Sequence, residues 1–485
     1  MFRNKEFSKL CDLSKKFLKK RPYLSNLGNP FLFVVSGHPF ILSRYKSVNS
    51  KKINFIFIFK YTFQLILNLI KINFFIIRLI FTKNHSNINK NFKKGSIIVS
   101  HLINSENFKK SIDTQFNGIE KEIEKNKTIF FYLDHINISN KDKIDSLNIK
   151  KNFFINNSCI ELSTYKKIII NIIKEFYFLL NRIKKTNNNF EKKFYLECAK
   201  YLFSLSTIKN IILFYNLEKL IIKKKITYIT ITLEGHPYEH LIFLLGKMYK
   251  IKVYAYQNTY ITKNHFSMFL NLGTNFLPTK ILASGKISYD FLRTKFNRKK
   301  VFLLGSNKYQ KQKKIKDHNN SNCLVIPTGL ENESNELLKL CHECLDKEKN
   351  LNRKFILRLH PLINRSNFIK KNQKILKSEK RIEISNSKLA DDITVCKFVL
   401  YRASSAVVEA AQQGLVPIYF YDNINNFQSD ALWQLKSKTT IKNAKELVKF
   451  LNKKQPIDKK RFVKCINFTN NFYRPINYKK LREIF

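Results

Sequence analysis

The chain has 485 residues, and its 89 Lys and Arg against 35 Asp and Glu give a formal net charge of +54. Hydrophobic residues at 44% and aromatic residues at 14% provide enough apolar surface for a folded core, which excludes an intrinsically disordered chain. The presence of only 11 Gly and 10 Pro also excludes collagen-like and low-complexity architectures.

The positive charge is spread along the chain rather than gathered in one segment, and no RNA-recognition, homeodomain or zinc-finger motif is present. We therefore expect a solvated surface that prefers anionic partners, with no specific recognition of nucleic acid. The chain opens without the apolar core of a signal peptide, and its 8 cysteines lie far apart. We accordingly expect a cytoplasmic protein with reduced thiols and no cofactor.

The first predicted element is an apolar stretch at residues 53–81, which Lys60, Lys71 and Arg78 interrupt. A lysine near the middle of a bilayer span is costly, so the spacing argues against a transmembrane helix. Two interpretations remain open. The stretch is either a basic amphipathic helix in the interface of an anionic membrane, or a pair of core helices in a helical N-terminal region.

Short apolar runs alternate with helical segments in the rest of the chain, which is typical of parallel α/β sheets. The first series of expected strands lies at 96–100, 129–133, 227–233, 252–256 and 280–283, with a basic helical stretch at 165–214. The second series lies at 323–327, 354–359, 395–400 and 416–420. Because a Lys- and Asn-rich loop at 307–322 separates the two series, we expect two Rossmann-like domains.

The densest group of titratable side chains follows the expected strand at 227–233. Glu234 ends this strand, where partial desolvation would raise its pKa toward the value that a general base needs. His236 and Glu239 follow it and are reserve candidates, and a polar strand-to-helix turn without catalytic residues is the alternative. The run from His236 to His240 also matches the HxxEH pattern of zinc peptidases. We predict no metal site, because the helix is expected to begin only at Pro237 and no third ligand stands out.

Three strand ends of the second series carry groups that suit a phosphate. Thr328 and Glu331 have the spacing of a capping box around Gly329, which predicts either backbone amides facing an anion or a plain helix cap. His360 and Pro361 follow a buried strand, where the imidazole can donate a hydrogen bond to a phosphate oxygen. The third group, at a turn and the start of a short helix, contains Ser404, Ser405 and Glu409.

These runs together resemble a family of surface carbohydrate biosynthesis proteins. The matching segments are LEGHPYEH at 233–240, VYAYQNT at 253–259, ILASGK at 281–286, RLHP at 358–361 and YRASSAVVEA at 401–410. The His-Pro and Ser-Ser motifs are also similar to those of bacterial sialyl-, polysialyl- and Kdo-transferases and of polyol-phosphate transferases. The resemblance covers about residues 227–430. It implies a GT-B-like α/β fold, with two Rossmann-like domains facing a cleft and a helical basic N-terminal extension.

The resemblance also implies a division of labour along the chain. The expected regions are a helical N-terminal region at 1–92, an acceptor domain at 93–300, a nucleotide-sugar domain at 301–440 and C-terminal helices at 441–485. Glu234 would be the general base and His360 would contact the donor phosphate. Thr328, Gly329 and Pro361 would line the nucleotide site with the two serines, and Glu409 would bind ribose or pack its helix. Because leucine replaces the second acidic residue before Glu234, Asp134 is a further candidate base.

The resemblance finally implies an inverting, metal-independent glycosyltransferase of capsule or other surface polysaccharide synthesis. Its partners would be a nucleotide-sugar donor, expected to be CMP-linked, and a glycan or lipid-linked acceptor. A location at the inner face of the cytoplasmic membrane would agree with an interfacial helix at 53–81. Transfer of a polyol phosphate from a CDP-linked donor and a non-catalytic basic protein that binds nucleic acid or membranes are the alternatives.

Overall fold

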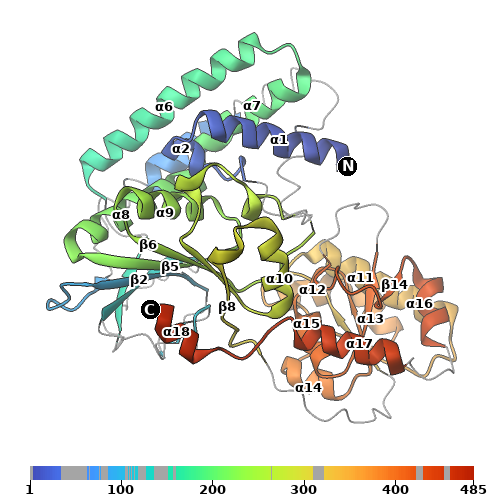
Figure 1. The fold of residues 1–485 in the computed structure, drawn as a ribbon. Helices are drawn as coiled ribbons and strands as arrows, with labels where there is room; N and C mark the ends of the chain where they lie inside the picture. The colour runs from blue at the N-terminus through green and yellow to red at the C-terminus, as the bar shows by residue number, and fades with distance from the viewer. Residues whose placement is uncertain are drawn as a thin grey trace.

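The computed structural model describes most of the chain, with gaps that are longest before residue 160. The described residues are 4–33, 48, 63–64, 66–75, 77, 86–103, 108, 110, 112–113, 115–117, 119, 127–135, 151–156, 160–263, 265–309, 322–421, 430–452 and 459–484. They form two α/β units, each built around its own sheet (Figure 1).

The first sheet is parallel except at its β1 edge. Its strands, in spatial order, are β1 (Ser86–Asn87), β4 (Asn152–Ile155), β3 (Thr128–Asp134), β2 (Gly95–Leu102), β5 (Ile226–Thr232), β6 (Lys252–Gln257), β7 (Lys280–Ala283) and β8 (Val301–Leu303). The central strands are nearly continuous apolar runs, because helices and loops cover a parallel sheet on both faces.

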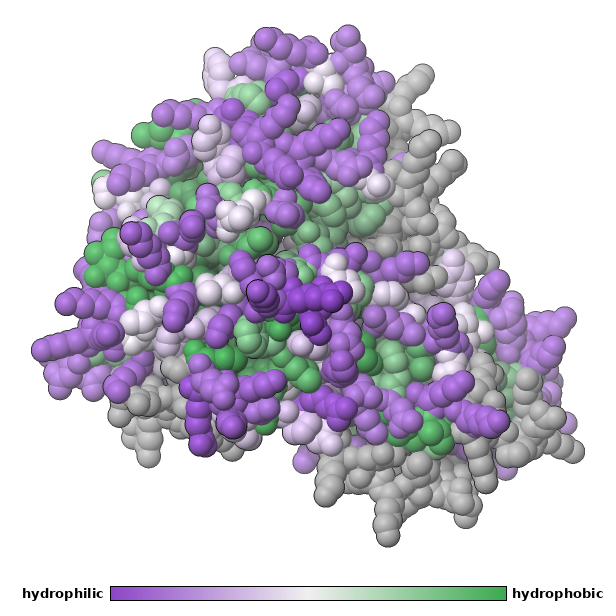
Figure 2. All heavy atoms as spheres, in the orientation of Figure 1, coloured by the Kyte–Doolittle hydropathy of each residue, from purple (hydrophilic) through white to green (hydrophobic). Residues whose placement is uncertain are grey.

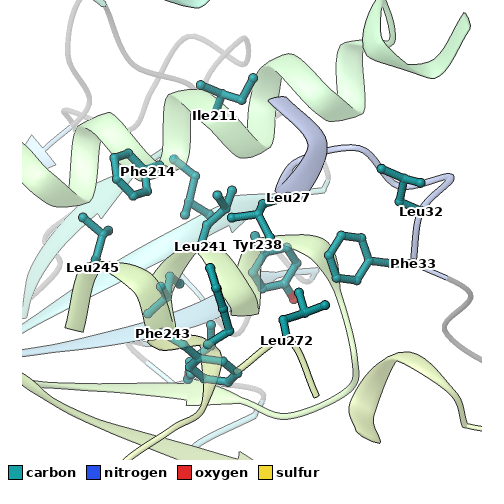
Figure 3. Packing of buried hydrophobic residues seen from close by; sticks show 14 of the residues in the cluster. Leu27, Leu32, Phe33, Ile211, Phe214, Tyr238, Leu241, Phe243, Leu245 and Leu272 are labelled. Carbon is teal, nitrogen blue, oxygen red and sulfur yellow. The ribbon is translucent and has the colours of Figure 1, made fainter. Parts of the chain in front are cut away.

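Helices cover one face of the first sheet in two layers. They are α1 (Asn4–Lys20), α2 (Leu24–Leu27), α6 (Leu162–Lys185), α7 (Asn189–Leu202), α8 (Leu205–Lys224), α9 (Pro237–Met248) and, toward the second sheet, α10 (Lys286–Lys295). Figure 3 shows Tyr238 and Leu241 of α9 packed close to Leu27 of α2 and to Phe33, within one large buried cluster. Helix α6 lies along the outer side of this layer (Figure 1).

The second sheet is parallel throughout. Its strands, in spatial order, are β11 (Ile382–Ile384), β10 (Phe355–Leu357), β9 (Cys323–Ile326), β12 (Phe398–Tyr401), β13 (Val416–Phe420) and β14 (Thr439–Ile441). Its helices are α11 (Glu331–Lys347), α12 (Arg365–Lys371), α13 (Gln373–Ser378), α14 (Leu389–Thr394), α15 (Ala406–Gln412), α16 (Ala444–Leu451) and α17 (Lys459–Asn470).

The C-terminal segment returns to the first sheet. Helix α18 (Tyr478–Ile484) places Leu481 and Ile484 in the buried cluster on the face opposite to α8 and α9, together with Ile98 and Tyr256. The end of the chain therefore lies beside the first sheet, although α16 and α17 pack on the second (Figure 1). The last residues of the chain thus contact both units.

The expected fold class is confirmed, since the chain is an α/β protein with two parallel-sheet domains and a helical N-terminal region. The basic stretch predicted as helical is the sequence of α6, α7 and α8. Of the apolar stretch at 53–81, only residues 63–64, 66–75 and 77 are described, and they are helical. None of the helices in the described part of the chain has the length and apolar character needed to cross a bilayer.

Candidate active site

The turn between β5 and α9 is held in one conformation by a buried carboxylate. Glu239, in the first turn of α9, accepts the backbone N–H groups of Glu234 at 2.8 Å and of Gly235 at 2.9 Å. Gly235 has φ +83°, and a Cβ at this position would lie 2.7 Å from the backbone nitrogen of Met268. Burial raises the pKa of Glu239 to about 7, against the opposing effects of His236 and the two backbone amides. Glu239 therefore holds this turn in place through two hydrogen bonds to its backbone.

Glu234 projects from this turn and forms a hydrogen bond with His236. The distance from Glu234 Oε2 to His236 Nε2 is 3.2 Å. Burial pushes the pKa of Glu234 upward, but the hydrogen bond from His236 and the charges of His236, His101 and Lys308 together lower it to about 2. The expectation of a raised pKa is therefore wrong. Glu234 is an anion at neutral pH and a weak proton acceptor by itself.

Two further histidines lie at the same edge of the sheet. His101 is the second-last residue of strand β2 and His135 directly follows β3, and His101 Nδ1 lies 2.8 Å from His135 Nε2. Tyr238 Oη lies 2.9 Å from His101 Nε2. Burial raises the pKa of Tyr238 and lowers the pKa of His101 to about 4, so both groups are neutral at neutral pH, and Tyr238, His101 and His135 form a chain of hydrogen bonds. His101 is not among the site residues predicted from the sequence.

The reserve candidate Asp134 is the last residue of β3 and is buried. Its neighbour His135 is hydrogen-bonded to His101 and through it to Tyr238. The signal that points to His101 is a histidine near the carboxyl end of a strand that neighbours β5 in the parallel sheet. That neighbour relation depends on strand order, which the sequence does not state.

A loop after β6 joins this edge to the second domain. His265 Nε2 donates to the backbone carbonyl of Glu234 at 2.6 Å, and Lys308 Nζ donates to the carbonyl of Asn258 at 3.1 Å. Tyr260 Oη donates to the carbonyl of Ala403 at 2.9 Å. Since Tyr260 follows the carboxyl end of β6 and Ala403 follows that of β12, the carboxyl edges of the two sheets meet at this loop.

A second hydrogen bond across the domains fixes the same loop. Trp433 Nε1, from the second domain, donates to the carbonyl of Ile261 at 2.8 Å, and the Trp433 ring packs edge-on against Phe291 of α10. The loop therefore contacts the second domain at two points on either side of a peptide bond, through Tyr260 and Ile261. The first of these contacts lies next to Ser404, which is predicted to bind the donor.

On the second sheet, His360 follows β10 and has a defined tautomer. The backbone N–H of Leu362 donates to His360 Nδ1 at 3.2 Å, which leaves the ring proton on Nε2. Burial lowers the pKa of His360, so the ring is a neutral donor. A Cβ on Gly329 would lie 3.2 Å from His360 Nδ1, and the glycine is thus in close contact with the imidazole. Gly329, His360 and the exposed Pro361 therefore lie together, as the strand-end argument predicts.

The predicted capping box between Thr328 and Glu331 is wrong. Helix α11 begins at Glu331, and the carboxylate that reaches back is Glu333, which accepts the Thr328 amide at 3.2 Å and the Thr328 hydroxyl at 2.6 Å. Glu331 instead pairs with Lys371 on the surface. Because Glu333 accepts both hydrogen bonds, Thr328 shapes the turn, and neither its amide nor its hydroxyl points toward a ligand phosphate.

Ser404 and Ser405 lie between β12 and α15, as predicted. Ser405 is exposed and is the N-cap residue of α15, but its hydroxyl makes no capping hydrogen bond. Ser404 is partly exposed and follows Ala403, whose carbonyl accepts the hydrogen bond from Tyr260. Glu409 lies in the first turn of α15 and is partly buried, close enough to Tyr473 to raise the pKa of that phenol, after the larger effect of burial.

The zinc-peptidase pattern has no structural counterpart. Pro237 is the first residue of α9, so His236 lies before the helix, while His240 is buried and packs its ring against Phe33 and Phe243. Burial lowers the pKa of His240 to about 4. Among the described residues no group of three or more His, Cys, Asp or Glu side chains is arranged to hold a metal ion.

No family model matches the chain, and no curated protein matches it. Solved structures with a similar fold include UDP-GlcNAc 2-epimerase from Methanocaldococcus jannaschii, at 15% identity over 81% of this chain and 99% of that one, with a TM-score of 0.45. The glycotransferase of kitacinnamycin is similar at 9% identity over 81% and 98%, with a TM-score of 0.46. The calicheamicin glycosyltransferase is similar at 8% identity over 81% and 97%, with a TM-score of 0.45. At these values the likeness does not bear on substrate or reaction.

Proposed function

We propose that this chain is an inverting glycosyltransferase that moves a sugar from a nucleotide-activated donor to a surface polysaccharide or lipid-linked acceptor. The observation that carries the proposal is the loop after β6. Through His265 and Tyr260 it connects the Glu234 turn of one sheet to the Ala403 turn of the other. Acid–base groups and phosphate-binding groups thus come from opposite sides of one junction, as transfer between a donor and an acceptor requires.

The second domain supplies the donor side of the proposed site. His360 presents a neutral Nε2–H donor, and Gly329 packs against its imidazole at the neighbouring strand end. Ser404 and Ser405 provide two hydroxyl groups after β12, which lies on the other side of β9 from the strand that His360 follows. Such fixed donors stabilise the negative charge that develops on a leaving nucleotide phosphate. The CMP-linked donor rests on the resemblance of the His-Pro and Ser-Ser motifs.

The first domain supplies the acceptor side. The acceptor hydroxyl loses its proton to His236 while its oxygen forms a bond to the anomeric carbon. The bond from that carbon to the donor phosphate breaks, and its electron pair leaves with the nucleotide. Glu234, which is ionised across the neutral pH range, orients the imidazole and stabilises the imidazolium. A single displacement of this kind inverts the configuration at the anomeric carbon.

Thermal-shift titration with CMP, CDP, UDP, GDP and ADP tests the donor side. A nucleotide present at about 100 times its Kd stabilises the folded protein by about 2.7 kcal/mol, which is readily measured. We expect one nucleotide to stabilise the wild type and the effect to be lost in His360→Ala and Ser404→Ala. The matched control is His342→Ala, which removes a histidine of α11 that pairs with Asp346.

The outcomes separate the alternatives. Stabilisation by CMP supports the proposed donor class, and stabilisation by UDP or GDP supports a glycosyltransferase with a different donor. A CDP-linked donor that yields a phosphodiester product would identify a polyol-phosphate transferase. Absence of any nucleotide effect, together with steeply salt-dependent binding to nucleic acid, would contradict the proposal and favour a basic binding protein.

A further inference from the structure

Helix α6 has apolar side chains on the face that points away from the protein. Its inner face buries Ile168, Ile172, Glu175 and Leu179. On the opposite face, four exposed apolar side chains follow helical spacing, and their exposed fractions are 57% for Leu162, 51% for Ile170, 50% for Ile173 and 67% for Tyr177. In a helix that only covers a core, this outer face would be polar.

The same outer face is strongly cationic. The exposed basic side chains of α6 are Lys166, Lys167, Lys174, Arg182, Lys184 and Lys185. Its one acidic residue, Glu175, is buried and accepts hydrogen bonds from Arg21 and Asn26. The outer face therefore has no carboxylate of its own helix to neutralise it. Figure 2 shows the region at the top, where α6 lies, as mostly hydrophilic with hydrophobic atoms between.

A second exposed apolar row lies in the same helical layer. In the described part of 63–77, the side chains of Phe63, Ile66, Ile70, Phe74 and Ile77 are exposed at spacings of three and four residues. Ile72 of the same segment is buried in the cluster that also contains Ile168 and Ile172 of α6. Both rows thus project from the layer that covers one face of the first sheet.

Charge and shape together identify the kind of partner. Nucleic acid would use the lysines but not the aliphatic side chains between them. A bilayer interface uses both, because apolar side chains enter the boundary between headgroups and acyl chains while lysines contact anionic headgroups. A helix of 24 residues is about 36 Å long, so it can lie flat on such a surface along its whole length.

We propose that the outer face of α6 docks the protein on an anionic phospholipid bilayer. Ile170, Ile173 and Tyr177 enter the interface, and Lys166, Lys174 and Lys184 contact the headgroups. The proposal goes beyond the glycosyltransferase reaction, since α6 contributes no residue to the candidate active site. It adds to the stretch at 53–81 a surface that the sequence analysis placed only within a basic helical segment.

The proposal is tested by co-sedimentation of the full chain with lipid vesicles. The vesicles contain phosphatidylcholine and about 30% phosphatidylglycerol, which gives them an anionic surface. We expect the triple variant of Ile170→Gln, Ile173→Gln and Tyr177→Gln to reduce the partition coefficient about tenfold or more. Glutamine preserves helix propensity, so circular dichroism should be unchanged. The matched control replaces three other half-exposed apolar residues, through Ile222→Gln, Met248→Gln and Val463→Gln.

A lysine series tests the charge component, which is essential because the whole chain is basic. Neutralising Lys166, Lys174 and Lys184 with glutamine should reduce binding to anionic vesicles several-fold at low salt. The control neutralises the same number of exposed lysines of the second domain, through Lys339→Gln, Lys347→Gln and Lys370→Gln. Phosphatidylcholine vesicles alone should bind weakly in both cases.

Equal losses in the α6 variants and in their matched controls would overturn the proposal, because binding would then follow net charge and not this face. Wild-type protein that forms a dimer in solution, ignores vesicles and becomes a monomer in the apolar variant would also overturn it, and would assign the face to a second copy. Thermal stabilisation by nucleotide should remain unchanged in every α6 variant, so failure of the membrane proposal is distinguishable from failure of the proposed reaction.

Discussion

Alanine at Gly235 should disturb the candidate active site through one added methyl group. With φ at +83°, an alanine is forced into a left-handed backbone conformation, which destabilises the fold by about 1–3 kcal/mol. The new Cβ would also lie 2.4 Å from Ser267 Oγ and 2.7 Å from Met268 N. The serine side chain can rotate away, but the backbone nitrogen cannot, so the turn must move. Overpacking of this kind adds about 1–3 kcal/mol.

The matched control is alanine at Gly273, where φ is +112° and no atom lies within 4 Å of the added Cβ. At φ +112° and ψ +171° this variant has a backbone cost of the same order, about 1–3 kcal/mol, without overpacking. The free energy of unfolding, measured in urea by circular dichroism, should therefore be lower for Gly235→Ala than for Gly273→Ala by about 1–3 kcal/mol. Only Gly235→Ala should also lose turnover, measured as nucleotide release, because the movement displaces Glu234. Equal stability and equal activity in the two variants would refute the reasoning.

Three further predictions concern the same junction. Glu239→Ala leaves the amides of Glu234 and Gly235 without their acceptor and should lower the free energy of unfolding by about 2–5 kcal/mol in urea titration. An unchanged midpoint would contradict the role of Glu239 in holding this turn. Because the pKa of Glu234 is lowered from 4.5 to about 2, its ionised form stabilises the fold above the unfolded value, and this contribution is lost as pH falls from about 5 toward 2. Wild type should be more stable than Glu234→Gln by up to about 3 kcal/mol at pH 7. In thermal melts this difference should shrink as the pH falls from about 5 toward 2, and a constant difference would contradict the lowered pKa of Glu234. Tyr260→Phe should raise the KM for the donor with little change in kcat, whereas the exposed control Tyr478→Phe should change neither.

The sequence predicts the strands in the interior of each sheet, which are buried apolar runs. Strands β2, β3, β5 and β9 were expected near their observed bounds, because strands buried on both faces need nearly continuous hydrophobic sequence. The missed strands β1, β4, β8, β11 and β14 have two to four residues and lie at or next to the edges of the two sheets, where a short segment carries little apolar pattern to distinguish it from a loop. Their pairing is imposed by the sheet that they extend.

The site is less predictable, because its contacts join distant parts of the chain. Burial of Glu234 follows from its place at a strand end, but its pKa is lowered by the hydrogen bond and charge of His236 and then by His101 and Lys308, which only the folded chain brings near. The partner of Thr328 was misassigned because Glu331 and Glu333 are both near the helix start, and the exact first residue of α11 decides which carboxylate reaches back. His360 and Gly329, by contrast, lie together because strands β9 and β10 are neighbours and parallel.

Proton NMR of the product formed from a nucleotide-sugar donor and a glycan acceptor tests the central claim most directly. The glycosyltransferase account predicts a product with the anomeric configuration inverted relative to the donor. It also predicts that His236→Ala and Glu234→Gln lose turnover while nucleotide binding, measured by thermal shift, stays intact. Retained configuration, or normal turnover in His236→Ala, would contradict the assignment of the Glu234 and His236 pair to the removal of the acceptor proton.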